Sequence, residues 1–282
     1  MTVPNFLIIG AQKSGTTWVS HRLHQHPDVF MVHGTYFFDN PENFARGVEW
    51  YQRFFGESAG KRAVGEKTPS YLWGEKFFPM GSGDPDNVPR RVREVIPEAR
   101  LIVVLRNPVT RAISHFNHSI RSGKLSPFAD IDRVLTGNDS PYAQSLGHLE
   151  RGLYSKQIVR WLKFFPREQL RILIFERDVI QQPTETLNEL CTFLGIDPKF
   201  EFKTVHSKEN QKLCKTELIL KYYVPPLRKV LRPILKRLPQ DSFKARAETY
   251  EFLANYYAKE NQQLARELGV DLSCWEKFAQ AA

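Results

Sequence analysis

The chain has 282 residues, of which 41% are hydrophobic and 25% are charged, a composition that excludes a disordered or fibrous protein and supplies a sizeable core. Forty basic side chains against thirty-one acidic ones give a net charge of +9, which favours an anionic partner. Three cysteines do not make a disulfide framework and no apolar stretch approaches the roughly 18 residues of a membrane span, so we expect a cytoplasmic protein.

The first predicted elements are a strand, a loop and a helix within residues 5–26. Gly10 and Gly15 have the spacing of a phosphate-binding loop. However, Thr16 stands where a nucleotide triphosphatase has its lysine, and Lys13 lies inside the loop instead. Backbone N–H groups before a helix still favour an anion, so we predict a phosphate-type site rather than a site for a magnesium triphosphate.

Three further apolar runs are predicted as strands, at residues 63–67, 101–105 and 171–175. Helical patterns alternate with them, one over residues 154–165 and one that ends before Gly195. Strands that alternate with helices indicate a parallel sheet covered on both faces. We therefore predict an α/β, P-loop-like three-layer fold with a central parallel sheet of about five strands flanked by helices.

Three segments together carry a family resemblance: GAQKSGTTW at residues 10–18, GEKTPSY at 65–71 and LRNPVTRAIS at 105–114. The chain resembles the sulfotransferases that use 3′-phosphoadenosine 5′-phosphosulfate (PAPS), and within them is most similar to the heparan sulfate and bacterial group. The resemblance implies a PAPS-binding core over about residues 5–200, followed by a helical, basic segment over about 201–282. Because the loops at 79–89 and 121–147 do not separate two cores, we expect a single sulfotransferase domain over residues 1–282.

The resemblance also implies which residues bind PAPS, the sulfuryl donor. The loop residues that match the 5′-phosphosulfate site are Lys13, Ser14, Gly15, Thr16 and Thr17. Lys13 would stabilise the charge that develops on the bridging oxygen. Arg106, at the end of a strand, and Ser114, on the next helix, match the clamp for the 3′-phosphate. Trp18 matches an aromatic face for the adenine, with a core tryptophan as the alternative. The product would be adenosine 3′,5′-bisphosphate.

For the chemistry, the resemblance implies that Glu66 is the general base that deprotonates the acceptor. A salt bridge with Lys67 is the alternative role for Glu66. His118 lies four residues after Ser114, so the two share a helix face, along with Arg111. In the amine-sulfating branch of the family, a histidine at this offset lines the reaction centre, and a partly exposed helix histidine is the alternative. In-line attack without a covalent enzyme intermediate and without a metal is expected.

The sulfuryl acceptor is predicted from a position where this chain departs from the family pattern. Family members that act on glycans often carry a Lys-Glu pair before the aromatic pair Phe37-Phe38, whereas this chain has His33-Gly34-Thr35-Tyr36. We therefore expect a hydroxyl group, less readily an amine, on a compound smaller than a heparan chain or on a lipid-like compound. Lys208, Lys212 and Lys215 are alternative residues for closing over the nucleotide.

Residues 221–237 contain six basic side chains and no acidic one, and apolar residues recur at helical spacing through residue 238. This segment could lie on an anionic membrane, and a basic helix packed on the core is the alternative. No nucleic-acid partner is expected, because the rest of the chain is nearly neutral and lacks a nucleic-acid-binding motif. The sequence leaves two alternative functions: a P-loop kinase of a small substrate, and a basic module that binds membranes or polyanions.

Overall fold

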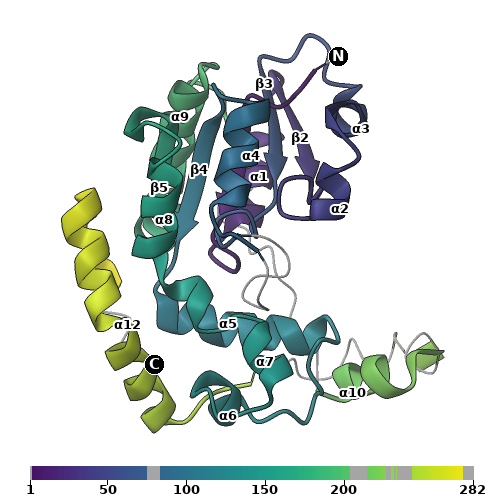
Figure 1. Cartoon of the computed structure of the whole chain (residues 1–282), viewed down its shortest axis with the longest axis vertical. Coiled ribbons are helices and arrows are strands. Elements are labelled where there is room, and N and C mark those ends of the chain that lie inside the picture. Colours follow the sequence, from purple (N-terminus) through teal and green to yellow (C-terminus); the bar gives the residue numbers. More distant parts are fainter. Residues whose placement is uncertain are drawn as a thin grey trace. The chain divides into compact units, whose positions relative to one another are not determined.

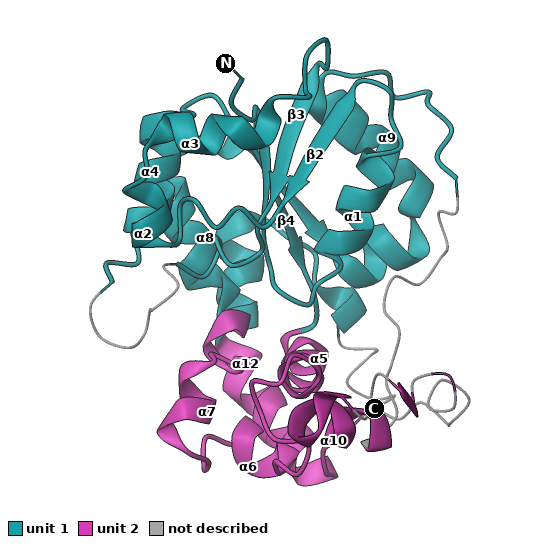
Figure 2. Ribbon diagram, turned by 90° about the vertical axis from the view of Figure 1, so that its right-hand side faces the viewer, with its two compact units in different colours: residues 1–107, 153–207, 260–281 teal, residues 108–152, 208–259, 282 magenta. Residues whose placement is uncertain are grey.

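The computed structural model describes residues 2–74, 83–203, 215–226, 230, 231, 233 and 243–275. The chain forms two compact units (Figure 2). Unit 1 comprises residues 1–107, 153–207 and 260–281, and unit 2 comprises residues 108–152, 208–259 and 282. Segments of the two units alternate along the sequence, so no single position separates them. One domain for the whole chain stays a prediction.

A parallel sheet of five strands forms the centre of unit 1 (Figure 1). In chain order the strands are β1 (Phe6–Gly10), β2 (Val29–His33), β3 (Ala63–Lys67), β4 (Arg100–Leu105) and β5 (Leu170–Ile174). Their order across the sheet is β2-β3-β1-β4-β5, and every neighbouring pair is parallel. This sheet confirms the predicted α/β fold.

Both faces of the sheet are covered, because successive side chains of the strands enter two different hydrophobic clusters. On β1, Leu7 and Ile9 join one cluster, while Phe6 and Ile8 join the other. The helices α4 (Asn87–Val95) and α8 (Tyr154–Leu162) pack on the first cluster, and α1 (Thr16–Leu23) and α9 (Pro183–Leu194) pack on the second (Figure 2). Continuous apolar strands are expected for a sheet buried on both sides.

The strand order places the ends of three strands together. β1 is paired with β3 on one side and with β4 on the other. The connection after β1 leads to β2, on the β3 side of the sheet, whereas the connection after β4 leads to β5, on the opposite side. Ligands of open α/β sheets bind at the carboxyl ends of strands at such a point. The loop after β1, the end of β3 and the end of β4 carry most of the predicted site residues.

The other helices of unit 1 are short, except at the end of the chain. They are α2 (Pro41–Phe44), α3 (Val48–Gln52), η1 (Arg53–Phe55), η3 (Arg167–Gln169) and η4 (Phe175–Gln181). The helix α12 (Ala247–Leu268) belongs to unit 2 up to Lys259 and to unit 1 from Glu260.

The remaining described elements of unit 2 are helices. They are α5 (Pro108–Arg121), α6 (Ile131–Leu135), α7 (Pro141–Ser145), η2 (Glu150–Gly152) and α10 (Lys215–Tyr223). The stretch 121–147, predicted as irregular, thus contains two short helices. Each has a side-chain cap: Asp130 accepts from the backbone N–H groups of Asp132 and Arg133, and Ser140 accepts from that of Ala143.

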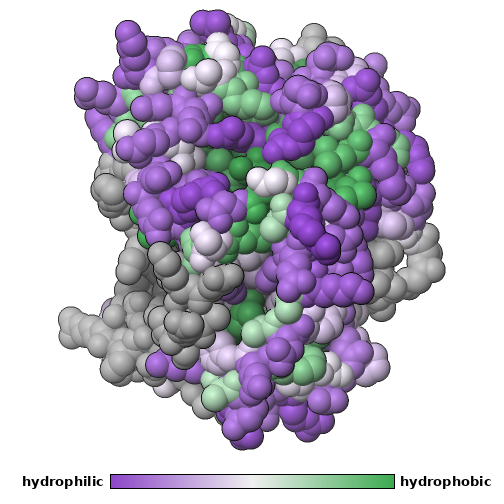
Figure 3. Space-filling view, turned by 90° about the vertical axis from the view of Figure 1, so that its left-hand side faces the viewer, coloured by the Kyte–Doolittle hydropathy of each residue, from purple (hydrophilic) through white to green (hydrophobic). Residues whose placement is uncertain are grey.

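Apolar side chains reach the surface in both units, for example Phe54 in unit 1 and Phe128 in unit 2. On the face shown in Figure 3, hydrophilic side chains cover most of the described surface and hydrophobic ones lie between them. Among the helices that the structure describes, none combines the length and apolar character needed to cross a membrane.

Candidate active site

The loop after β1 forms a candidate anion site at the N-terminus of α1. Gly15 precedes this helix with a left-handed φ of 95°, and a Cβ atom there would lie 2.6 Å from Cδ2 of Phe175, so only glycine fits. The first turn of α1 has no acidic residue. The Ser14 hydroxyl is fully buried and has no hydrogen-bond partner among the described residues. Free N–H groups and an unpartnered hydroxyl suit a phosphate or sulfate group.

Arg106, just after β4, lies against this loop. Its Nη1 donates to the backbone oxygen of Lys13 at 3.3 Å, and its Cζ lies 5.1 Å from the centre of the Phe175 ring. The Tyr154 hydroxyl donates to the backbone oxygen of Arg106 at 2.9 Å. Two of the residues predicted to bind PAPS, Lys13 and Arg106, therefore lie together in the structure.

The residue after Arg106 is anchored by a buried carboxyl group. The Asn107 N–H donates to Glu176 Oε1 at 3.0 Å, and Trp275 Nε1 donates to Glu176 Oε2 at 2.9 Å. Asn107 Nδ2 also donates to the backbone oxygen of Trp275 at 3.2 Å. Burial raises the pKa of Glu176. These contacts fix the end of β4, from which Arg106 projects.

Four hydroxyl groups surround the carboxylate of Glu66, which is fully buried on β3. Oε1 accepts from Thr35 at 2.6 Å, from Thr68 at 2.5 Å and from Tyr71 at 2.9 Å, and Oε2 accepts from Tyr51 at 2.6 Å. Burial and the nearby Glu66 raise the pKa of both tyrosines well above its usual value. The phenols therefore stay protonated and donate. We call these four groups the hydroxyl cage.

Lys67 connects β3 to the anion site, because its Nζ donates to Thr17 Oγ1 at 3.2 Å. His33 on β2 pairs with Lys67 across the sheet. Partial burial of the His33 ring, the Lys67 charge and the nearby His21 and His24 lower the pKa of His33 to about 4. The ring centres of His21 and His33 are 5.8 Å apart. The Lys67 charge adds positive potential beside the N-terminus of α1, as an anionic ligand requires.

Trp18 is almost completely buried, with 6% of its surface exposed, and it belongs to the cluster on the α1 face of the sheet. The Arg22 guanidinium lies 5.8 Å from its ring centre. These contacts are those of a core tryptophan, and the adenine role stays a prediction.

The other predicted site residues, Ser114 and His118, lie on α5 in unit 2. Both are partly exposed and one turn apart. Arg111, which was expected on the same face, is instead fully buried, and its guanidinium donates to the backbone oxygen of His148. Lys208 and Lys212 lie outside the described residues, as does the side chain of Lys215.

Four residues around Glu66 were missed by the sequence analysis. Thr68 and Tyr71 follow Glu66 by two and five residues, so they lie in the GEKTPSY segment, and their hydroxyls could have been weighed there. Tyr51 and Thr35 lie 15 and 31 residues away. No local signal marks these two as partners of Glu66, because their contact depends on the pairing of β2 with β3 and on the packing of α3.

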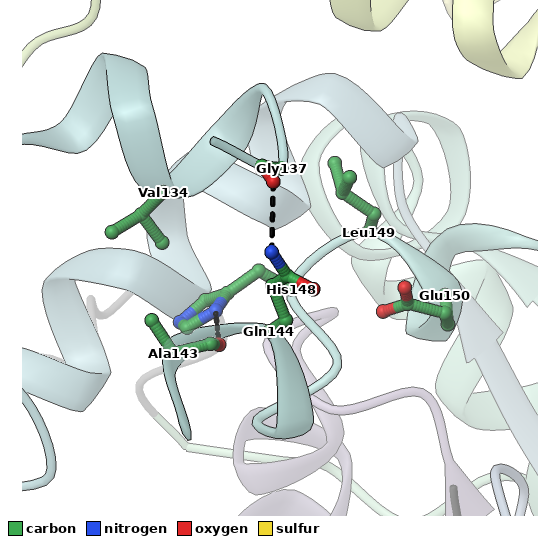
Figure 4. A pocket seen from close by; sticks show the side chains of 7 residues that line it. All are labelled: Val134, Gly137, Ala143, Gln144, His148, Leu149 and Glu150. Carbon is green, nitrogen blue, oxygen red and sulfur yellow. Dashed lines mark hydrogen bonds between the residues drawn. The ribbon is translucent and has the colours of Figure 1, made fainter. Parts of the chain in front are cut away.

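Unit 2 holds a separate buried polar cluster on α5. The rings of His115 and His148 are 4.4 Å apart, and Ser119 Oγ lies 3.0 Å from His148 Nε2. Burial and nearby positive groups lower the pKa of both histidines, to about 3 for His148. A cavity of about 90 Å³ adjoins the His148 ring, and Gln144 spans part of it by donating to the backbone oxygen of Gly137 at 2.8 Å (Figure 4). Both histidines are therefore neutral near pH 7.

Comparisons with known proteins identify the family of this chain. The family model described as "Sulfotransferase domain" matches residues 3–222. The heparan sulfate glucosamine 3-O-sulfotransferase 5 of Mus musculus is 29% identical over 70% of this chain and 55% of its own length. The bifunctional heparan sulfate N-deacetylase/N-sulfotransferase 2 of Bos taurus is 33% identical over 70% of this chain and 22% of its own length. The chain thus spans about half or less of these relatives.

A solved structure shares the whole architecture. The crystal structure of a sulfotransferase from Alicyclobacillus acidocaldarius superposes with a TM-score of 0.70 at 25% identity, covering 98% of this chain and 100% of that one. The sulfotransferase domain from the curacin biosynthetic pathway, at 15% identity and a TM-score of 0.50, shows the same fold. The family model matches well over half of the sequence. The predicted resemblance is thereby confirmed, and the chain belongs to the sulfotransferase domain family.

Proposed function

We propose that this chain transfers the sulfuryl group of PAPS to a hydroxyl group, or less readily an amine, of an acceptor. The observation that carries this proposal is the anion site before α1, with Arg106 held against the Lys13 backbone. PAPS supplies the sulfuryl group and leaves as adenosine 3′,5′-bisphosphate.

The residues present fit the donor. The Ser14 hydroxyl and the N-terminus of α1 offer hydrogen bonds to a 5′-phosphosulfate. Lys13 and Lys67 add positive charge, and Lys67 donates a hydrogen bond to the Thr17 hydroxyl. Arg106 has the planar guanidinium that suits a phosphate, and we assign it to the 3′-phosphate. The motif roles of Ser114 at the 3′-phosphate and of His118 at the reaction centre stay predictions.

In the proposed reaction, Glu66 is the base that receives the acceptor proton. Lys13 stabilises the charge on the oxygen that bridges sulfur and the 5′-phosphate as this bond breaks. The acceptor attacks in line, without a covalent enzyme intermediate, and no metal ligand is assigned. Full activity after treatment with a chelator is the expected result for this last point.

Calorimetric titration tests the donor assignment. Adenosine 3′,5′-bisphosphate should bind at least about ten-fold more tightly than ATP without magnesium, because only the bisphosphate offers a 3′-phosphate to Arg106. Adenosine 5′-phosphate is the matched control, since it lacks only the 3′-phosphate. Binding of ATP that equals or exceeds that of the bisphosphate would favour a kinase and contradict the proposal.

For the acceptor, we propose a compound smaller than a heparan chain or a lipid-like compound presented at an anionic surface. The departure at Gly34-Thr35 supports this choice, as does the basic segment 221–238, half of which lies outside the described residues. Neutralising Arg228, Lys229, Arg232, Lys236 and Arg237 together should leave nucleotide binding unchanged and reduce binding to anionic vesicles, as added salt does. Rapid sulfation of desulfated heparan that these changes abolish would contradict this assignment.

A further inference from the structure

The hydroxyl cage restricts how Glu66 can act as a base. None of the Glu66 surface is exposed. The carboxylate accepts from four hydroxyls, three at Oε1 and one at Oε2, so Oε1 has no lone pair left for a further donor. An acceptor hydroxyl therefore has no open path to Glu66 in this arrangement, and the proton needs a group that contacts both.

Among the four cage residues, Thr35 alone has measurable exposure. It retains 5% of its surface, whereas Thr68, Tyr51 and Tyr71 are fully buried. Thr35 also lies in the loop between β2 and α2, next to Tyr36, which is 49% exposed. A small molecule at the surface of this loop thus meets the Thr35 side chain before the other three.

The hydrogen bonds of Thr35 leave its oxygen able to receive a proton. Thr35 donates its proton to Glu66 Oε1 at 2.6 Å, and Tyr71 donates its own to the same oxygen at 2.9 Å. Neither hydroxyl has a second proton for the 3.3 Å contact between them. Thr35 Oγ1 accepts one long hydrogen bond, from the Phe37 N–H at 3.2 Å, so a lone pair remains for an incoming donor.

The loop holds Thr35 in this position. Gly34 and Tyr36 on either side of it have positive φ values of 69° and 52°, a backbone that turns the side chain between them toward Glu66. Asn43 Nδ2 donates to the backbone oxygens of Thr35 at 3.1 Å and of Tyr36 at 3.2 Å. Burial, followed by the nearby Asp39 and then Glu66, raises the pKa of Tyr36, so its phenol also lies in the field of the Glu66 carboxylate.

We propose that Thr35 is a catalytic residue that relays the acceptor proton to Glu66. The acceptor O–H bond breaks and its proton joins Thr35 Oγ1, while the proton already on Thr35 passes to Glu66 Oε1. The freed electron pair of the acceptor oxygen forms the bond to sulfur, and the bond from sulfur to the 5′-phosphate oxygen breaks. This relay rests on the proposed sulfuryl transfer, and its test separates the two.

The test compares Thr35→Val with Thr68→Val, because each change removes one hydroxyl donor from the same oxygen of Glu66. Transfer is measured with radiolabelled PAPS and three acceptors: para-nitrophenol, a long-chain alcohol in detergent micelles, and a desulfated heparan oligosaccharide. With the acceptor that is labelled fastest, Thr35→Val should lower kcat about 100-fold, the scale of a lost proton-transfer group. Thr68→Val should lower it less than about five-fold, and Thr35→Ser should restore most of the activity.

Two further readouts separate a relay from a structural role. All three variants should bind adenosine 3′,5′-bisphosphate as tightly as the unmodified protein. In a Glu66→Gln background, Thr35→Val should lower kcat less than about three-fold further, because both residues serve one step. Equal losses in Thr35→Val and Thr68→Val, or additive losses with Glu66→Gln, would overturn the relay while leaving sulfuryl transfer intact. No labelling of any acceptor by the unmodified protein would instead contradict the proposed function, and the relay with it.

Discussion

Glu66 has no surface exposed to solvent and satisfies its two oxygens with hydroxyl protons from four side chains. A carboxylate in the protein interior is stable only when hydrogen-bond donors surround it. Removing one of these donors leaves a desolvated lone pair on the carboxylate. Tyr51 is the one cage residue that bonds to Oε2. Its hydroxyl therefore has a different task from that of Thr35: it keeps the carboxylate in place.

Tyr51→Phe should lower the free energy of unfolding by about 1.5 to 3 kcal/mol, the usual range for a hydrogen bond to a charged group. Denaturation in urea measures this loss. Tyr142→Phe is the matched control, because the Tyr142 side chain is 56% exposed, and it should change stability by less than about 0.5 kcal/mol. Equal stability of the two variants would show that Glu66 does not depend on the Tyr51 hydroxyl.

Arg106 supports a second prediction at this scale. Arg106→Ala should weaken binding of adenosine 3′,5′-bisphosphate by more than about 1.5 kcal/mol, because a charged donor to a phosphate is lost. Adenosine 5′-phosphate should bind equally to both proteins. Arg90→Ala is the control, since Arg90 pairs with Asp84 at the surface. If both nucleotides weaken by the same amount, Arg106 does not contact the 3′-phosphate.

At the scale of elements, the connection from β1 to α1 depends on the backbone of Gly15 and on its contact with Phe175 from the segment after β5. The positive φ makes any side chain unfavourable, and the close ring makes a Cβ atom impossible without movement. The loop after β1 and the segment after β5 are thus closely packed at the N-terminus of α1.

Gly15→Ala should lower the free energy of unfolding by more than about 1 kcal/mol and weaken nucleotide binding about ten-fold or more. Gly47→Ala is a close control: Gly47 has a φ of 81°, but a Cβ atom there meets no atom within 4 Å. It should show the backbone penalty alone, with nucleotide binding unchanged. Thermal melts measure the stability of the two variants, and calorimetry measures their nucleotide binding. Equal losses in the two variants would argue against a role for the Phe175 contact.

The sequence predicts those parts of the fold that local patterns encode. The apolar runs at β1, β3, β4 and β5 were recognisable, and the predicted strand 63–67 has the bounds of β3. The edge strand β2, with the sequence VFMVH, was missed although it is no shorter than the recognised strands β3 and β5. Glu66 could be predicted from its motif, but the cage could not, since Thr35 and Tyr51 reach it only through tertiary packing.

At the scale of the whole molecule, stability should depend on pH through histidines of both units whose pKa folding lowers. Folding lowers the pKa of His148 from 6.5 to about 3 and that of His33 to about 4, and it lowers that of His115 as well. Below pH 6.5 the unfolded chain therefore binds protons that the folded chain excludes. The stability present above pH 6.5 is lost progressively as the pH falls toward 3.

Unfolding in urea at a series of pH values between 7 and 4 tests this dependence. The free energy of unfolding should fall steadily through this range. His148→Gln should flatten the curve, because the variant has one fewer group to protonate on unfolding. Val159→Ala is the control, and it should leave the slope nearly unchanged because Val159 is exposed and has no titratable group. A His148 variant with the slope of the unmodified protein would refute the role of this histidine.

The contacts of Glu176 with Asn107 and Trp275 bear on the order in which the protein is made. Asn107 and Trp275 are 168 residues apart. At about 5 to 20 residues per second, a ribosome synthesises Trp275 roughly 8 to 34 seconds after Asn107. The five strands are complete long before that, yet the strand end that carries Arg106 lacks its Trp275 contacts. A nascent chain can therefore assemble its sheet during translation, while the proposed nucleotide site acquires its Trp275 support only after this later segment emerges.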